Sequence, residues 1–323
     1  MCDHHHHHHD HDDKTSFKFF FTYASSGWKL FEGKVLIIYS TLLGISSSVE
    51  IFSGLYLQDS HVVTEGFHTM FHALCIWAAM IALAYGINHP NPDKSASFGY
   101  ARAQVIAAFG NSIFALFIGF FALFEAVHEI ISEEISDSNP EIMPILFGKL
   151  ALHMVFFLHL RGFLFDNDKL PNDNLGVVAL HCLGLLTTDL IRVFSLYFEF
   201  ECMAYPLYHT ESGLNILWVL VLICIVRTYL YKNGRILLMC SPTGKYREIL
   251  LKKIREISLI EGVVSVKEEK MWMLNNQEIV GSLKIEVHGE GKNVAAKAEE
   301  ILNGVLSFVV VEVENSDNIE SYL

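Results

Sequence analysis

Two histidines stand one helical turn apart inside an apolar stretch that is long enough to cross a bilayer. They are His68 and His72, within the stretch Phe67–Ile87. Side chains four residues apart share one face of a helix, so these two imidazoles can bind one ion together. A third histidine, His181, lies in another apolar stretch. Ionisable groups at membrane depth are costly and normally face an ion path, and imidazole nitrogen is a preferred ligand of zinc. The three histidines therefore predict a buried cation site.

The composition favours a membrane protein. The chain has 323 residues, of which 52% are hydrophobic and only 18% are charged, and its mean hydropathy is +0.35. We therefore expect a lipid bilayer as its surroundings. A net charge of -13 argues against a nucleic-acid partner, because phosphates require a basic surface. The sequence has no nucleophile–base arrangement and no phosphate-binding loop, so we do not expect an enzyme.

The N-terminal residues form a second histidine cluster. Six histidines, His4–His9, are followed by Asp10, His11, Asp12 and Asp13. Such tracts bind metal ions. The run is equally compatible with a native segment and with an expression tag, and the sequence leaves both open. The first thirty residues lack the apolar core of a cleavable signal peptide.

Six apolar runs reach spanning length. They are Val35–Leu57, Phe67–Ile87, Ala103–Ile131, Met143–Phe165, Leu175–Phe200 and Leu214–Tyr231. Lys and Arg are absent from segments 58–66, 132–142 and 201–211, whereas every alternate connection carries them. Because positively charged loops stay in the cytosol, both termini are predicted to be cytosolic.

The polar C-terminal part predicts a small α+β domain. Its expected elements are a helix at Tyr246–Ser258, strands at Val263–Leu274 and Glu278–His288, a helix at Val294–Leu302 and a strand at Leu306–Glu314. This ferredoxin-like α-β-β-α-β order places both helices on one face of the sheet. We therefore predict a cytosolic N-terminal segment at residues 1–34, a six-helix membrane domain at residues 35–238 and a cytosolic domain at residues 239–323.

Other polar residues in the spans are first interpreted as structural. For His153 and His159 in the fourth span, the favoured interpretation is a core histidine bonded to a carbonyl. Asp189 lies eight residues beyond His181, about 12 Å along an ideal helix, which is too far for the same ion. An ion pair with Arg192 on the same helical face explains it better.

Two glutamates and a lysine complete this set. Glu50 in the first span and Glu125 in the third either line the ion path or brace the helices, and bracing is the favoured interpretation. Lys149 in the fourth span is a possible ion-pair partner for them, or it extends toward the membrane surface.

Several short motifs follow one another along the chain in a specific order and spacing. They are the run Thr64–His72, Ser97–Arg102, Ala107–Phe114, Phe124–Val127, Gly234–Leu238, Glu261–Val263 and Lys270–Leu274. Together they resemble the cation diffusion facilitator family of zinc transporters. The six spans and the short α+β tail agree with the resemblance, which covers nearly the whole chain beyond residue 30. Within that family the chain looks closest to eukaryotic members of the early secretory pathway.

This resemblance implies a two-fold dimer that exchanges cytosolic Zn2+ for protons from an organelle lumen. Family members bind the ion between spans two and five, commonly with two histidines and two aspartates. Matched residue by residue, the chain offers His68 and His181 as expected. His72 and Leu185 stand where aspartates are expected. Three neutral imidazoles leave the charge of the ion uncompensated, so the affinity of this site should be reduced.

Three functions remain open. The first is a working Zn2+/H+ antiporter that loads a Golgi, vesicular or other endomembrane lumen and uses His68, His72 and His181 as ligands. The second is a transport-inactive subunit of a heterodimer with a related zinc transporter, because such subunits in this family also lack part of the ligand set. The third is a membrane scaffold that senses metal through its N-terminal histidines. The sequence does not decide between a homodimer and a heterodimer.

Overall fold

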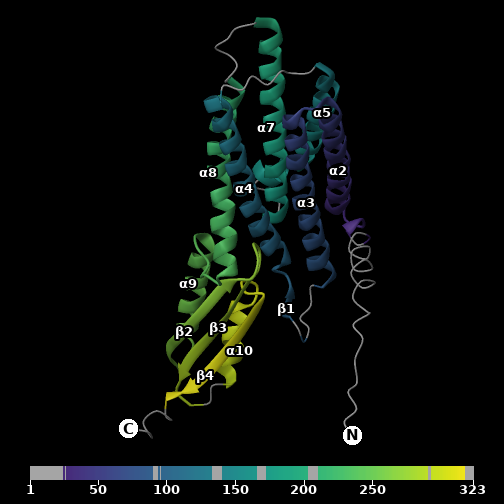
Figure 1. The fold of residues 1–323 in the computed structure, drawn as a ribbon. Helices are drawn as coiled ribbons and strands as arrows, with labels where there is room; N and C mark the ends of the chain where they lie inside the picture. The colour runs from purple at the N-terminus through teal and green to yellow at the C-terminus, as the bar shows by residue number, and fades with distance from the viewer. Residues whose placement is uncertain are drawn as a thin grey trace, which may run out of the picture. The chain divides into compact units, whose positions relative to one another are not determined.

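The computed structural model describes residues 25, 27–89, 94, 96–132, 140–165, 172–202, 210–289 and 292–316. The N-terminal histidine run lies outside these described residues. The chain divides into two compact units, residues 1–230 and 231–323. The helices and strands of both units are drawn in Figure 1.

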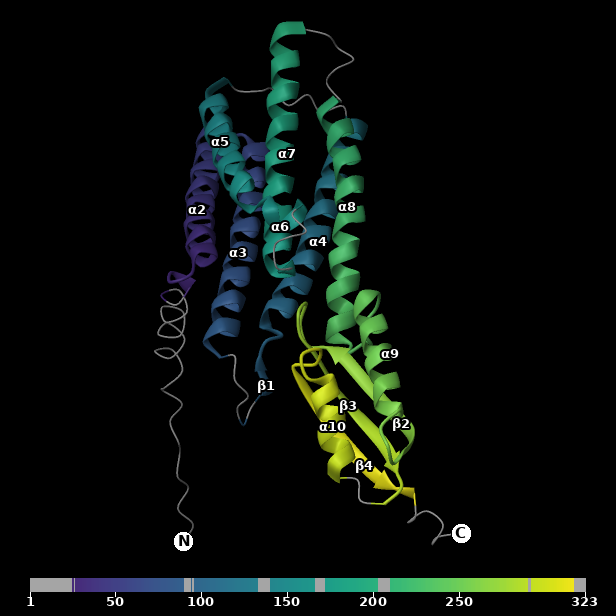
Figure 2. The same ribbon diagram turned by 180° about the vertical axis from the view of Figure 1, so that it is seen from behind.

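Six helices in the described chain are long and apolar enough to cross a bilayer. They are α2 (Phe31–Leu57), α3 (Ser60–Asn88), α4 (Ala103–Ser132), α5 (Met143–Leu160), α7 (Asp173–Cys202) and α8 (Thr210–Leu237). The predicted α-helical polytopic membrane protein with six spans is confirmed. In the ribbon, α7 runs through the middle of the bundle (Figure 2) and packs against α3, α4 and α5.

Helix α3 begins seven residues before the predicted span, at Ser60 rather than Phe67. The carboxylate of Asp59 caps it by accepting hydrogen bonds from the backbone N–H groups of His61 and Val62, at 3.0 and 3.2 Å. A capping aspartate satisfies N–H groups that have no partner inside the helix. The segment expected as a loop therefore forms the first two turns of α3, and it carries polar residues into the bundle.

Helices α2 and α3 pack closely through two glycines. A Cβ atom added at Gly66 would lie 2.7 Å from Ile51 Cγ1, and one added at Gly54 would lie 2.7 Å from Val63 Cγ2. Small residues let helix backbones approach each other in membranes. Because the backbones are close, the Ser47 hydroxyl donates a hydrogen bond across the interface to the carbonyl of Gly66, at 2.9 Å.

The interior of the bundle changes character along its length. The half that contains the start of α2 and the end of α3 has an apolar core from α2, α3, α5 and α7, formed by Leu36, Tyr39, Leu43, Ala73, Ile76, Ala79, Met80, Leu83, Leu160, Leu175, Val178, Ala179, Cys182 and Leu185. The other half buries polar groups from the same four helices, among them Glu50, Thr69, Lys149, His153 and Asp189. His72 and His181 are located where these two halves meet.

The C-terminal unit has the predicted order of elements: α9 (Lys245–Ser258), β2 (Val263–Met273), β3 (Ile279–Val287), α10 (Lys292–Leu302) and β4 (Phe308–Asn315). Strand β3 is central, antiparallel to β2 and parallel to β4. Both helices contribute to one apolar cluster with alternate residues of β3, which confirms that they cover the same face. On the other face, Ser265 and Lys267 hold the pKa of Glu286 below its usual value through hydrogen bonding and charge.

Candidate metal centre

The three histidines from the second and fifth spans come together inside the bundle. His72 Nδ1 lies 2.8 Å from His181 Nδ1, and His72 Nε2 lies 3.3 Å from His68 Nε2. His72 and His181 are buried, and His68 is partly buried. The helices that carry them are the most buried of the six: within the most apolar window of each helix, 61% of residues in α7 and 44% in α3 are buried. The fold thus brings the three imidazoles together inside the bundle, and their binding of an ion stays a prediction.

A backbone carbonyl orients the three rings. The oxygen of Asn111 lies 3.1 Å from His181 Nε2, which must donate because a carbonyl only accepts. With neutral rings, His181 Nδ1 then accepts from His72 Nδ1, and His72 Nε2 accepts from His68 Nε2. These tautomers are assigned from the hydrogen-bond partners. A histidine that binds metal commonly donates its second ring N–H to a carbonyl in this way.

The ring spacings differ in how well they suit one ion. Two nitrogens bound tetrahedrally to Zn2+ at about 2.0–2.1 Å are separated by roughly 3.3 Å. The nitrogens of His68 and His72 already have this separation. His181 is too close to His72, and it faces the opposite ring nitrogen of that residue. Joint binding by all three rings therefore requires the hydrogen bond between His72 and His181 to open.

A small cavity adjoins the three rings. The volume of this cavity is about 40 Å³, which is more than the ~10–15 Å³ that one water molecule needs. Leu185 is among its lining residues. It therefore lies beside the histidines, at the place where the family resemblance implies an aspartate. Apart from the imidazoles, Thr188 and Trp218, the lining is apolar, and it contains no carboxylate from the described residues.

Carboxylates gather instead around one buried lysine. Lys149 Nζ lies 3.1 Å from Glu65, 3.3 Å from Glu50 and 3.6 Å from Asp189. Glu50 also accepts a hydrogen bond from the Thr69 hydroxyl at 3.1 Å. Unpaired charge is expensive to bury, so this lysine and these acids stabilise one another. Glu65 is three residues from His68 on α3, hence on the same face and about 4.5 Å along the axis.

The structural predictions for Asp189 and His159 were wrong, and the prediction for His153 was right in part. Asp189 does not pair with Arg192: its carboxylate binds His153 Nδ1 at 2.6 Å and Lys149, whereas Arg192 lies 3.5 Å from Glu211. Side chains that approach from α5 outcompete the neighbour on the same helix. His153 is a buried core histidine, although its partner is a carboxylate rather than a carbonyl. His159 is exposed on α5 and has no core role.

For Glu50 and Lys149, the structure favours one of the two interpretations. Glu50 braces α2 against α3 and α5 through Thr69 and Lys149, and Lys149 is an internal partner rather than a surface-directed one. Glu125 makes no hydrogen bond or ion pair with a described residue, so the bracing predicted for it is not supported. Glu65 was missed because the predicted span began at Phe67. The capping signal of Asp59 before an apolar run could have extended the helix and placed Glu65 one turn before His68.

Comparison with known proteins identifies the family. Residues 36–238 match the model of the cation efflux transmembrane domain. A Dictyostelium discoideum protein described as a probable zinc transporter is 22% identical over 257 residues, which is 79% of this chain and 41% of that protein. Metal tolerance protein C2 of Arabidopsis thaliana is 25% identical over 256 residues, 79% of this chain and 64% of that protein. Zinc transporter 7-A of Xenopus laevis is 32% identical over 79 residues, 24% of this chain and 20% of that protein.

These findings define a polytopic membrane protein of six helices with a small α+β unit. The family match covers well over half of the chain, so the protein belongs to the cation efflux family. This confirms the resemblance that the sequence motifs indicated. The chain spans less than two thirds of the length of the two relatives aligned over most of it.

Proposed function

We propose that this chain carries Zn2+, or a similar divalent cation, from the cytosol into an organelle lumen in exchange for protons. His68, His72 and His181 are the ligands in this proposal. The convergence of their three rings at membrane depth is the observation that carries it. Ligation by imidazole without carboxylate disfavours Mn2+ relative to Zn2+ and Co2+.

The charges around the three histidines support a divalent cargo. Neutral imidazoles compensate none of the ion's charge, but Glu50, Glu65 and Asp189 carry three negative charges against the single positive charge of Lys149. If His153 is neutral, two negative charges remain next to the site. They match a divalent ion and take over the role of the two aspartates that His72 and Leu185 replace.

The polarity of the interior supports a direction. With the termini in the cytosol, as the loop charges predict, the apolar core lies on the cytosolic side of the histidines and the polar half lies on the luminal side. In this orientation, apolar packing closes the cytosolic side of the histidines, and buried polar groups on the luminal side support release of the ion toward the lumen. A Golgi, vesicular or other endomembrane location and a dimeric assembly belong to this proposal.

A second candidate function is an accessory subunit that does not transport alone. The leucine in the cavity and the closed hydrogen bond between His72 and His181 favour it. Such a subunit forms a heterodimer with a related zinc transporter that carries the complete ligand set.

Zinc flux distinguishes the two candidates. The purified chain is reconstituted into liposomes that contain a zinc-sensitive dye and hold an acidic interior. The antiporter hypothesis predicts zinc uptake that depends on the proton gradient and is abolished by His181→Ala. His159→Ala, an exposed histidine on α5, is the matched control and should retain uptake.

Absence of flux from the chain alone, with flux restored by a partner bearing histidine and aspartate ligands, establishes the accessory function. Uptake that persists in both histidine variants contradicts the proposed ion site.

A further inference from the structure

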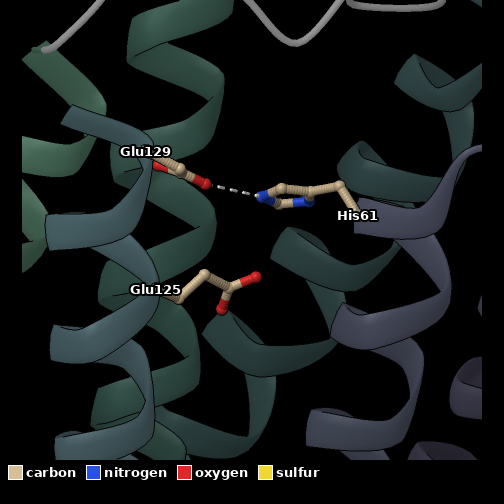
Figure 3. Close-up of side chains that lie close together, drawn as sticks. All are labelled: His61, Glu125 and Glu129. Atoms are coloured by element: carbon tan, nitrogen blue, oxygen red, sulfur yellow. Dashed lines mark ion pairs between the residues drawn. The ribbon is translucent and has the colours of Figure 1, made fainter. Parts of the chain in front are cut away.

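A second group of metal-binding side chains lies where α3 and α8 begin and α4 approaches its end. His61 from α3 and the pair Glu125 and Glu129 from α4 each direct one ligand atom into a shared space (Figure 3), and these atoms all lie within 4.8 Å of one another. His61 Nε2 and the Glu129 carboxylate are 3.5 Å apart. The helix spacing is responsible, because glutamates four residues apart on α4 share one face.

Glu125 has no hydrogen-bond or ion-pair partner among the residues that the structure describes. Its carboxylate points toward the side from which His61 approaches (Figure 3), although the side chain is partly buried. A partly buried carboxylate without a partner carries a desolvation cost that a cation could remove. Glu129, by contrast, accepts a hydrogen bond from the Ser212 hydroxyl at 2.7 Å, which fixes its position.

The surrounding charges suit a divalent ion. Arg192 Nη1 lies 3.0 Å from His61 Nδ1 and 3.5 Å from Glu211. The carboxylates of Glu125, Glu129 and Glu211 outnumber the single guanidinium of Arg192 by two. Arg192 also competes with an ion for the His61 ring, and Glu211 offers it an alternative partner. Because of this competition, we expect a lower cation affinity here than at the site of the three histidines.

We propose that His61, Glu125 and Glu129 form a second divalent-cation site, of mixed nitrogen and oxygen ligation. Zn2+ accepts both ligand types. The long glutamate side chains close the remaining distance by a change of rotamer. If transport proceeds as proposed above, this site receives the ion after the three histidines. That role depends on the proposed function, whereas the binding itself does not.

Equilibrium zinc binding to the full chain tests the proposal. In every sample His4–His9 and His11 are replaced by glutamine, so that the N-terminal tract does not bind the metal. Bound zinc per chain is measured by dialysis against buffered free Zn2+. We expect two ions per chain with different affinities. Glu125→Gln combined with Glu129→Gln should remove the weaker site or weaken it at least tenfold, and His61→Ala should do the same without altering the carboxylates.

His128→Ala is the matched control, because this residue neighbours Glu129 on α4 but is exposed. It should leave both sites intact. If the glutamate variant and His61→Ala both retain two sites of unchanged affinity, the proposal is overturned. Combined His68→Ala and His181→Ala should remove only the tighter site. If they remove neither, the ion site of the proposed function fails while the second site stands.

Discussion

At the scale of single residues, the candidate metal centre separates its ligands from negative charge. The ring nitrogens of His68, His72 and His181 meet next to Leu185, whereas the buried carboxylates of Glu50 and Asp189 belong to the group around Lys149. A divalent ion at the histidines therefore depends on compensation from side chains that do not touch it. This arrangement leads to two predictions about side-chain substitutions.

Restoring the carboxylates should tighten zinc binding. In a chain with His72→Asp and Leu185→Asp, two negative charges would face the ion directly in a medium of low dielectric. We expect the zinc affinity of this site to rise at least tenfold, about 1.4 kcal/mol. Isothermal titration with Zn2+ measures it. His72→Asn combined with Leu185→Asn is the control, because asparagine has the size of aspartate without its charge; equal affinities for the Asn and Asp variants contradict the charge argument.

Removing the buried ammonium should destabilise the bundle. Lys149→Met keeps the length of the side chain but leaves Glu50, Glu65 and Asp189 without their shared cation. Breaking a buried ion pair from one side typically costs about 3–5 kcal/mol. Thermal unfolding in detergent should show a lower midpoint at neutral pH, with partial recovery in Lys149→Arg. A midpoint equal to that of the unmodified chain means that the carboxylates are not held by Lys149.

At the scale of elements, the α2–α3 hairpin sets the position of this network. Gly54 and Gly66 allow the two backbones to approach, and this approach places Glu50 within hydrogen-bond distance of Thr69. The start of α3 at Ser60 then adds two polar turns, which bring His61 and Glu65 into the bundle. The hairpin therefore positions residues of both proposed sites.

A methyl group at the close contact should loosen the hairpin. In Gly66→Ala the new Cβ would lie 2.7 Å from Ile51 Cγ1 and 2.9 Å from Ile51 N, so one helix must move. Overpacking of this kind costs about 1–3 kcal/mol. Gly44→Ala on α2 is the control, because nothing lies within 4 Å of its added Cβ. The two variants are compared by thermal unfolding, and equal midpoints would show that the approach at Gly66 is not tight.

The sequence predicted the helices far better than their polar contacts. Long apolar runs and period-two strands depend on local pattern, so the six spans and the order of elements in the C-terminal unit were predicted closely. The partner of Asp189 depended instead on α5, which is distant in sequence. Asp189 on α7 contacts His153 and Lys149 because α5 packs against α7, and this packing cannot be derived from the spacing of residues within one helix.

At the scale of the whole membrane unit, the change from an apolar to a polar interior gives the three histidines their position. The apolar core blocks one side of them, and the buried acids and Lys149 occupy the other. The sequence placed His68, His72 and His181 in the correct helices because spacing and span membership suffice for that. It did not reveal Glu65 or His61 as members of the bundle, because both lie in turns of α3 that looked like a loop. Without His61, the position of Glu125 and Glu129 beside it could not be predicted either.

X-ray absorption at the zinc edge tests most directly whether the three imidazoles hold the ion. The sample is the full chain with the N-terminal histidines replaced and with Glu125→Gln and Glu129→Gln, so that zinc occupies only the site of the three histidines. We predict imidazole nitrogens from three rings at about 2.0–2.1 Å, with one ring lost in His181→Ala. A shell of oxygen atoms alone, or a spectrum that His181→Ala leaves unchanged, contradicts the account.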